Sequence, residues 1–238
     1  MNTITTIKSN SLNNTYKPLL YYYKFNSGDI VSNLLANYKS GVVYDASVNN
    51  ATISTSTYKG GLGSMFFNNS TVSSSAYDTS LQWVKCPSFT TPSTRIGLSI
   101  SLWVNPSSIS SVRDWTCALT IGKQQSDYIT IGLLNSAVYI GMYGSDSYNG
   151  SLTAGAWTHV VWTISSDGVH VVYIDNVSYT PAGINGKLIK LNYTHEVAIG
   201  FNNSYPYYYW NGYVDDLRIY YNTVLTSNQV SSLYNNPT

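Results

Sequence analysis

The sequence predicts an all-β sandwich formed by one large domain of a 238-residue chain. Short alternating apolar and polar runs recur about every ten residues, with Gly, Asn and Asp turn signals between them. The chain does not alternate strands with long amphipathic helices, which is the pattern of parallel α/β folds. Asn, Ser, Thr and Tyr number 24, 34, 23 and 23, and these residue types favour strands and turns over helices.

The first part of the chain predicts an arm followed by short, widely spaced strands. Residues 1–17 are polar and unpatterned, so we expect a flexible N-terminal arm before a single domain at residues 18–238. Residues 19–25 are an apolar and aromatic run that predicts the first strand. Residues 29–50 are expected to form a long irregular connection. Short strands are then predicted at residues 51–54, 64–68 and 81–86.

The clearest alternation lies at residues 96–104, which predict a strand with an apolar inner face. The residues on that face would be Ile96, Leu98, Ile100, Leu102 and Val104. Strands of the same character are predicted at residues 115–121, 128–134 and 137–143.

The strongest hairpin signal is the Asp167-Gly168 turn, which separates two strand-like runs. The runs are residues 157–165 and 169–175. The last predicted strands are residues 197–201 and 213–220.

One short helix is predicted near the C-terminus. Thr226 and Gln229 have the spacing of a capping box, in which each side chain satisfies a free backbone N–H near the other residue. Val230, Leu233 and Tyr234 follow at helical spacing. We expect a helix of about two turns that seals one end of the sandwich.

Composition excludes several classes of function. The net charge is +1 and only 10% of residues are charged, against about 25% in ordinary globular domains. A chain without a basic stripe has no means of neutralising phosphates, so nucleic-acid binding is not expected. No window approaches eighteen consecutive apolar residues, so no membrane span is expected. The first residues lack the apolar core of a signal peptide, so cytoplasmic synthesis is expected.

The two cysteines, Cys86 and Cys117, each lie in an apolar alternating run. Buried free thiols fit this pattern better than a disulfide, although the pairing stays open. Two cysteines are too few for a disulfide-based scaffold.

Four segments, in this order, resemble laminin G-like domains of the concanavalin A-like lectin/glucanase superfamily. They are residues 21–26 with 43–50, residues 100–104, the Trp-Thr-His-Val-Val strand within residues 156–161, and Asn-Gly-Tyr-Val-Asp-Asp-Leu-Arg-Ile-Tyr at residues 211–220. The resemblance implies a jelly-roll sandwich of two antiparallel sheets with a short C-terminal helix. It implies ligand binding on a concave face or at rim loops, with glycans or protein surfaces as ligands.

The abundance of Asn and Tyr also resembles modules encoded by large DNA viruses of protists. That resemblance implies a virion component, such as a minor capsid or surface protein, with self-assembly or capsid partners. The low net charge is compatible with such an assembly, because it gives weak colloidal repulsion.

An enzyme is the weaker alternative. Retaining glycosidases need two carboxylates about 5–5.5 Å apart, and the chain has a single glutamate, Glu196. Asp215 and Asp216 are adjacent, so a regular strand would point them to opposite faces. We expect one of them to tether the C-terminal segment, and Arg218 to pair with Asp216.

The histidines, His159, His170 and His195, fit the sheet framework better than a zinc site, because no further ligand accompanies them. Some jelly-roll lyases use Tyr, His, Arg and Gln, and this chain contains those residue types. No lyase-like motif is present.

The most unusual short stretch is Tyr205-Pro206-Tyr207-Tyr208-Tyr209-Trp210. Trp210 is expected in the core. Tyrosine rings stack on sugar faces at low entropic cost, so the stretch predicts a ligand-binding loop. Packing against the sandwich edge or against a neighbouring subunit is the alternative. The candidate ligand-binding residues are Tyr205, Tyr207, Tyr208 and Tyr209.

No cofactor is required by any motif, but the family analogy suggests Ca²⁺ at Asp45 and Asp216. Ca²⁺ takes six to eight oxygen ligands, and the alternative for Asp45 is turn capping. The sequence as a whole therefore predicts a non-catalytic recognition module for glycans or a protein surface. A structural virion or assembly component is the alternative, and a polysaccharide-active enzyme is the weaker one.

Overall fold

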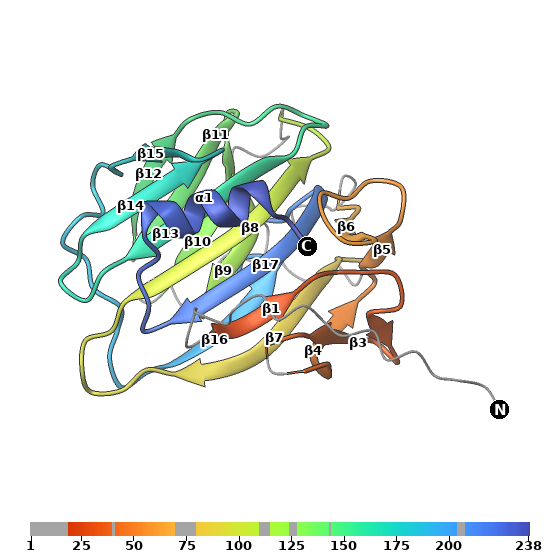
Figure 1. The fold of residues 1–238 in the computed structure, drawn as a ribbon, viewed down its shortest axis with the longest axis horizontal. Coiled ribbons are helices and arrows are strands. Elements are labelled where there is room, and N and C mark those ends of the chain that lie inside the picture. Colours follow the sequence, from red (N-terminus) through yellow and green to blue (C-terminus); the bar gives the residue numbers. More distant parts are fainter. Residues whose placement is uncertain are drawn as a thin grey trace.

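The computed structural model describes residues 19–39, 41–69, 80–109, 115–123, 128–142, 144–203 and 208–238. Within these ranges, seventeen strands form two antiparallel sheets, and one helix follows them (Figure 1). The predicted sandwich of two antiparallel sheets with a short C-terminal helix is confirmed. No helix in the described ranges is long and apolar enough to cross a membrane.

The eight-stranded sheet is built around β17, which pairs with β8 along one edge. On its other edge β17 pairs with β6 through its first residues and with β1 through its later ones. In spatial order the strands are β15 (Val177–Tyr179), β14 (His170–Ile174), β13 (Thr158–Ile164), β8 (Leu98–Pro106), β17 (Gly212–Tyr221), β6 (Ser64–Phe67) and β5 (Thr52–Ser54), with β1 (Leu19–Tyr23) beside β17.

The nine-stranded sheet lies behind it in the view of Figure 1. In spatial order its strands are β12 (Ser145–Asn149), β11 (Ala137–Met142), β10 (Ile129–Leu134), β9 (Trp115–Ile121), β16 (Thr194–Ile199), β7 (Trp83–Thr90), β4 (Val43–Asn49), β3 (Leu34–Asn37) and β2 (Ile30–Val31).

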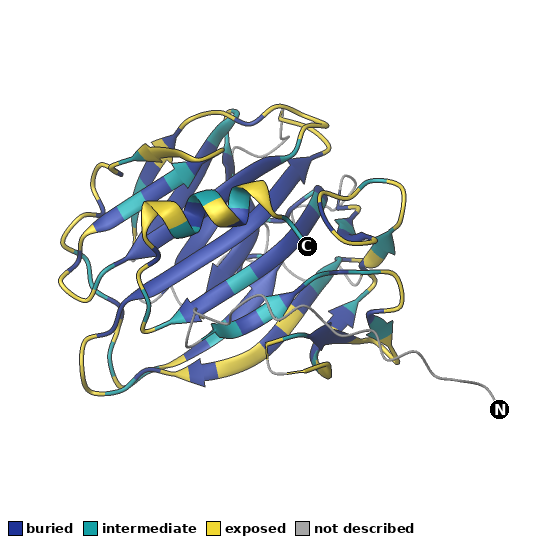
Figure 2. Cartoon of the chain, viewed as in Figure 1, coloured by how far each residue is buried: buried dark blue, intermediate teal, exposed yellow. Residues whose placement is uncertain are grey.

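The core fills the space between the two sheets, and the alternating strand β8 shows why it forms. Leu98, Ile100, Leu102 and Val104 are all buried in one cluster with side chains of both sheets. Each such side chain contributes about 1.5–3 kcal/mol when it leaves water. Figure 2 shows the central strands as buried along most of their length. The free thiols are buried as predicted, and so is Trp210.

Helix α1 (Ser227–Asn235) lies across the outer face of the eight-stranded sheet (Figure 1). Val230 and Leu233 pack there with Val161 of β13 and Tyr220 of β17. The predicted capping box at Thr226 is present. The prediction that the helix seals an end of the sandwich is wrong, because its apolar stripe packs on outward-facing apolar residues of the sheet and buries them.

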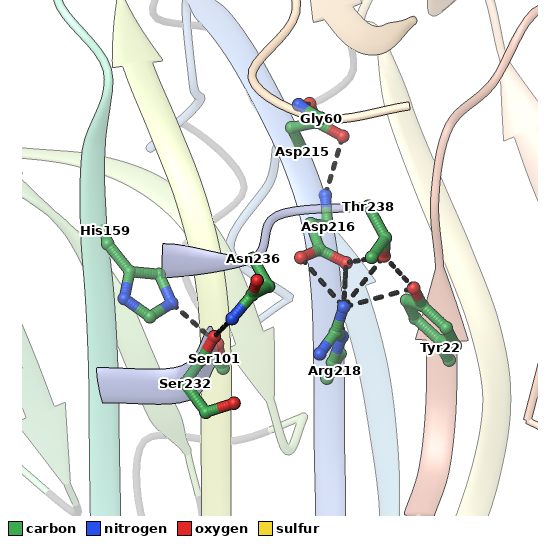
Figure 3. Close-up of polar contacts among 10 residues, drawn as sticks. All are labelled: Tyr22, Gly60, Ser101, His159, Asp215, Asp216, Arg218, Ser232, Asn236 and Thr238. Atoms are coloured by element: carbon green, nitrogen blue, oxygen red, sulfur yellow. Dashed lines mark hydrogen bonds and ion pairs between the residues drawn. The ribbon is translucent and has the colours of Figure 1, made fainter. Parts of the chain in front are cut away.

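A β-bulge in β17 corrects a second prediction. The register with β8 shifts between Asp215 and Arg218, and Asp216 has a φ of 47°. Leu217 faces the core, whereas Asp215 and Asp216 both lie on the outer side of the sheet (Figure 3). They were expected on opposite faces, which holds only for a strand without a bulge.

The bulge supports a buried polar cluster, shown in Figure 3. Arg218 forms an ion pair with Asp216 at 2.9 Å, as predicted. The Arg218 guanidinium also donates to the hydroxyls of Tyr22 at 3.1 Å and Thr238 at 2.8 Å. This cluster therefore ties β1, β17 and the segment after α1 together, which confirms the predicted tethering role.

Three segments differ from the sequence-based expectations. Residues 29–50 contain β2, β3 and β4 rather than an irregular connection. Two further short strands, β12 and β15, were not predicted. They escape detection because each is short and pairs with a single neighbouring strand.

We expect Arg218→Met to lower the free energy of unfolding by about 3–5 kcal/mol, because it leaves the buried Asp216 carboxylate without its partner. Urea denaturation would measure the loss. The double variant Asp216→Asn, Arg218→Met is the control and should recover much of the stability, since Asn tolerates a positive φ and carries no charge. Simple additivity of the two changes would contradict the ion-pair role.

Candidate functional site

A row of aromatic side chains crosses the outer face of the nine-stranded sheet at its β12 end. Tyr148 of β12 and Tyr139 of β11 are cross-strand partners, and their ring centroids lie 5.9 Å apart. The Tyr139 ring lies 5.0 Å from the ring of Trp115, at the start of β9. These three rings come from three strands, and they are brought together by pairing of the sheet.

Tyr208 extends this row from a different part of the chain. Its ring stacks on Trp115 with a centroid distance of 5.6 Å and an interplanar angle of 29°. The Tyr208 carbonyl accepts a hydrogen bond from the backbone N–H of Asn202 at 3.1 Å. We call Tyr148, Tyr139, Trp115 and Tyr208 the first aromatic row.

The first aromatic row has a buried base and an exposed surface. Tyr139 is 3% exposed and Tyr148 is 47% exposed, while Trp115 and Tyr208 are half-buried. Rings held in this way are pre-ordered, so a ligand that stacks on them loses little side-chain entropy.

A carboxylate borders the row. Asp146 of β12 accepts a hydrogen bond from the Tyr139 hydroxyl at 3.0 Å. Burial raises the pKa of Asp146, whereas the hydroxyls of Tyr139 and Tyr128 and the charge of Lys187 oppose that rise. The half-buried Asp146 therefore places acceptor oxygens beside the rings.

Gly141 explains how Tyr139 and Asp146 come so close. A Cβ at Gly141 would lie 2.4 Å from the Tyr139 hydroxyl and 2.9 Å from Asp146 Oδ1. Glycine at this strand position thus permits the close approach.

The tyrosines predicted as a binding loop have different positions. Tyr205 and Tyr207 lie outside the described residues. Tyr208 belongs to the first aromatic row. Tyr209 is buried, and its ring stacks on Phe201 at 6.2 Å.

The two predicted metal ligands lie in different sheets. Asp45 of β4 accepts hydrogen bonds from the Tyr23 hydroxyl and from Asn37 Nδ2, both at 2.8 Å. Asp216 does not fit a cation, because Arg218 occupies its carboxylate. Nowhere in the described ranges do three His, Cys, Asp or Glu side chains lie close enough to hold a metal ion. A Ca²⁺ site involving Asp45 stays a prediction.

The histidines of the eight-stranded sheet belong to its framework. His170 Nδ1 accepts from the Trp162 indole N–H at 3.2 Å, and His170 Nε2 donates to the Lys187 carbonyl at 2.9 Å. His159 Nε2 lies 2.9 Å from the Ser101 hydroxyl (Figure 3). Burial, with the charges of Arg218 and Lys59, lowers the pKa of His159 to about 3.

A separate hollow of about 410 Å³ lies at the turn between β13 and β14. Its lining comprises Asp167, Gly168, Val169, His170, Val171, Thr180, Asn185 and Gly186. None of these is a Tyr, Phe or Trp, and both ring nitrogens of His170 are engaged. The first aromatic row is therefore the stronger candidate site.

The sequence did not identify Tyr139, Tyr148 and Asp146 as site residues. Alternation places Tyr139 opposite to the core residues Val138 and Ile140, and this signal could have marked it as outward-facing. The strand that carries Tyr148 and Asp146 was not predicted at all.

The fold is a β-sandwich of two antiparallel sheets with a short C-terminal helix. The chain belongs to the concanavalin A-like lectin/glucanases superfamily, because the family model of that description matches residues 78–231. The resemblance found in the sequence is confirmed at the level of this family. No curated protein sequence matches the chain.

Solved structures share the fold. Domain 4 of AbnA, a GH43 extracellular arabinanase from Geobacillus stearothermophilus, solved with arabinotriose, has a TM-score of 0.65 at 18% identity, over 91% of this chain and 98% of that chain. The binding domain of botulinum neurotoxin serotype D has a TM-score of 0.63 at 14% identity, over 91% of this chain and 50% of that one.

A sialidase from Trypanosoma rangeli, in complex with the inhibitor DANA, has a TM-score of 0.59 at 15% identity, over 91% of this chain and 32% of that one. The chain thus spans about half the length of the toxin domain and about a third of the sialidase. At these identities the likeness establishes the fold.

We expect His159→Gln to weaken the pH dependence of stability. Unfolded histidine takes up a proton near pH 6.5, whereas buried His159 resists protonation until about pH 3. His159 therefore contributes stability that is present above pH 6.5 and is lost as the pH falls toward 3. Between pH 7 and pH 5 the wild-type chain should lose about 2 kcal/mol more than the variant.

Urea denaturation at the two pH values measures this difference. Glutamine keeps an amide that reaches the Ser101 hydroxyl but does not titrate. Parallel pH dependence of wild type and variant would show that His159 is protonated in the folded chain.

Proposed function

We propose that the chain is a non-catalytic glycan-binding module and that the first aromatic row is its binding face. The observation that carries the proposal is the gathering of four aromatic rings from separate segments beside the acceptor carboxylate of Asp146. Sugar rings present C–H faces that pack on aromatic rings, and their hydroxyls need fixed polar partners. The length of the row fits an oligosaccharide better than a single sugar.

The similar structures support this choice of ligand. The arabinanase domain was solved with arabinotriose, and a botulinum neurotoxin serotype D domain was solved with N-acetylneuraminic acid. Arabinotriose and N-acetylneuraminic acid are the molecules bound in those two structures. For this chain they make saccharides the first class of ligand to test.

The buried carboxylates support a non-catalytic role. Asp215 and Asp216 are 0% and 3% exposed, so neither reaches a substrate. Asp215 Oδ2 accepts hydrogen bonds from the backbone N–H groups of Lys59 and Gly60. Glu196 forms a surface ion pair with Lys123 at 3.2 Å. These carboxylates have structural partners rather than the facing geometry of an acid and a nucleophile.

An assembly component remains the second hypothesis, and one observation favours it. Val31, Val42, Val43 and Tyr44 are exposed near the β2 end of the nine-stranded sheet. Exposed apolar residues near a sheet edge are typical of contact surfaces. Sedimentation of a strictly monomeric protein at high concentration would contradict this role.

We expect Trp115→Ala to weaken glycan binding at least tenfold, which corresponds to about 1.4 kcal/mol, because it removes the ring in the centre of the first aromatic row. Tyr148→Ala should weaken binding in the same direction. A glycan array followed by calorimetry on the best ligand would measure both effects.

The matched control is Tyr44→Ala, since Tyr44 is 40% exposed and Tyr148 is 47% exposed, and the two lie at opposite ends of the same sheet. Tyr44→Ala should leave binding unchanged. The array is run with Ca²⁺ and with EDTA, and binding should persist in EDTA. Binding that EDTA abolishes would point to Asp45 instead of the rings.

A further inference from the structure

A second group of aromatic side chains lies on the outer face of the eight-stranded sheet, where β17 begins. The rings of Phe66 and Tyr213 are stacked with centroids 4.7 Å apart. The Trp157 ring lies 6.3 Å from Tyr213. All three residues are half-buried. We call Phe66, Tyr213 and Trp157 the second aromatic row.

Sheet register explains why these rings meet. Tyr213 pairs with Phe66 on one side and with Asn105 on the other. Thr158 pairs with Val104 on the far side of β8, so Trp157 comes next to Asn105. The second aromatic row therefore runs across β6, β17 and β8, and the register places Asn105 between Tyr213 and Trp157.

Asn105 has an incomplete set of hydrogen bonds. It is 2% exposed, and its Nδ2 donates to the Gly155 carbonyl at 3.2 Å. Its Oδ1 finds no hydrogen-bond partner in the described part of the chain. The indole N–H of Trp103, two residues earlier on the same face, lacks a partner among the described residues as well. Buried polar atoms are rarely left unpaired in folded proteins.

We propose that the second aromatic row is a binding site for a neutral saccharide. The ring faces of Trp157 and Tyr213 provide stacking surfaces, and a sugar hydroxyl donates to Asn105 Oδ1. Trp103 lies two residues from Asn105 on the same face and is covered by Tyr234 and Lys59, so its indole signal reports on the site without direct contact with the sugar. One of the half-buried rings turns aside to admit the sugar, as surface side chains do rapidly.

The unpaired acceptor also argues against a ligand that approaches Asn105 with an ionised acid group. Asn105 Oδ1 needs a donor, and ionised carboxylate or phosphate oxygens offer none. The nearby cation, Lys59, already lies over the Trp103 ring at 4.1 Å. The acceptor Asn105 Oδ1 thus selects a hydroxyl group rather than an ionised acid group.

The choice of a saccharide as ligand rests on the proposed function, but the site is separate from the first aromatic row. The two sheets pack through their inner faces, so the two rows lie on opposite outer faces of the molecule. A monomer with both sites would cross-link saccharide chains.

The test is NMR of the indole N–H signals of the full chain, titrated with arabinotriose and a panel of neutral trisaccharides. The signals are assigned through single Trp variants. We expect saturable shifts at Trp157 and Trp103 that persist in Trp115→Ala. Asn105→Leu, which removes the acceptor and keeps both rings, should weaken this binding at least tenfold. Trp157→Ala, a change at a half-exposed residue, is the second variant should Asn105→Leu fail to fold.

The outcomes separate the two proposals. Shifts at Trp115 alone would overturn the second site and leave the proposed function intact. Shifts at Trp157 and Trp103 alone would support the second site and remove the first aromatic row as the binding face. No shift with any trisaccharide would overturn both. Acetate, which carries a carboxylate and no hydroxyl, is the anionic probe, and a response at Trp157 equal to that of the neutral sugars would overturn the stated selectivity.

Discussion

The bulge in β17 is the constraint on which the outer face of the eight-stranded sheet depends. Because Asp216 adopts a positive φ, two neighbouring carboxylates point to the same side. Asp215 accepts hydrogen bonds from the backbone N–H groups of Lys59 and Gly60. Asp216 forms an ion pair with Arg218, whose guanidinium also donates to the Thr238 hydroxyl. One local irregularity thus fixes the loop before β6 and the segment after α1.

This arrangement divides that outer face into a covered part and an open part. Helix α1 and the Lys59 side chain cover Trp103 and His159 near the middle of the sheet, where Tyr234 stacks on Trp103 at 5.5 Å. Beyond them, the face ends in the half-buried rings at the start of β17. The covered histidine is neutral because it is buried, so its role is packing and hydrogen bonding in the framework.

The sequence was sufficient for the sandwich, the β13–β14 hairpin and the capped helix, since each depends on local periodicity or turn chemistry. It was not sufficient for the position of α1 or for the orientation of Asp215 and Asp216. The first is a tertiary contact, and the second depends on a bulge that shifts the two-residue period. The prediction of an irregular connection at residues 29–50 was wrong, because short strands near a sheet edge show little alternation and depend on their neighbours.

The candidate site was also beyond prediction from local sequence patterns. The tyrosine-rich stretch was visible in the sequence, but its two described tyrosines have different environments. Tyr208 stacks on Trp115, whereas Tyr209 is buried. Tyr139 and Tyr148 lie near Trp115 because the sheet places β12, β11, β10 and β9 side by side. A set of rings assembled from separate strands has no local sequence signature, so sheet register, rather than any motif, defines the site.

The placement of rings on both outer faces limits how such a module engages glycans. A sandwich holds its two faces rigidly apart, so one glycan chain lying flat on the first aromatic row does not also reach the second. Simultaneous occupancy then needs two chains, and a linked second binding event strengthens attachment only where the geometry permits both. If both rows bind saccharides as proposed, affinity for a dense glycan surface would arise from linking neighbouring glycan chains.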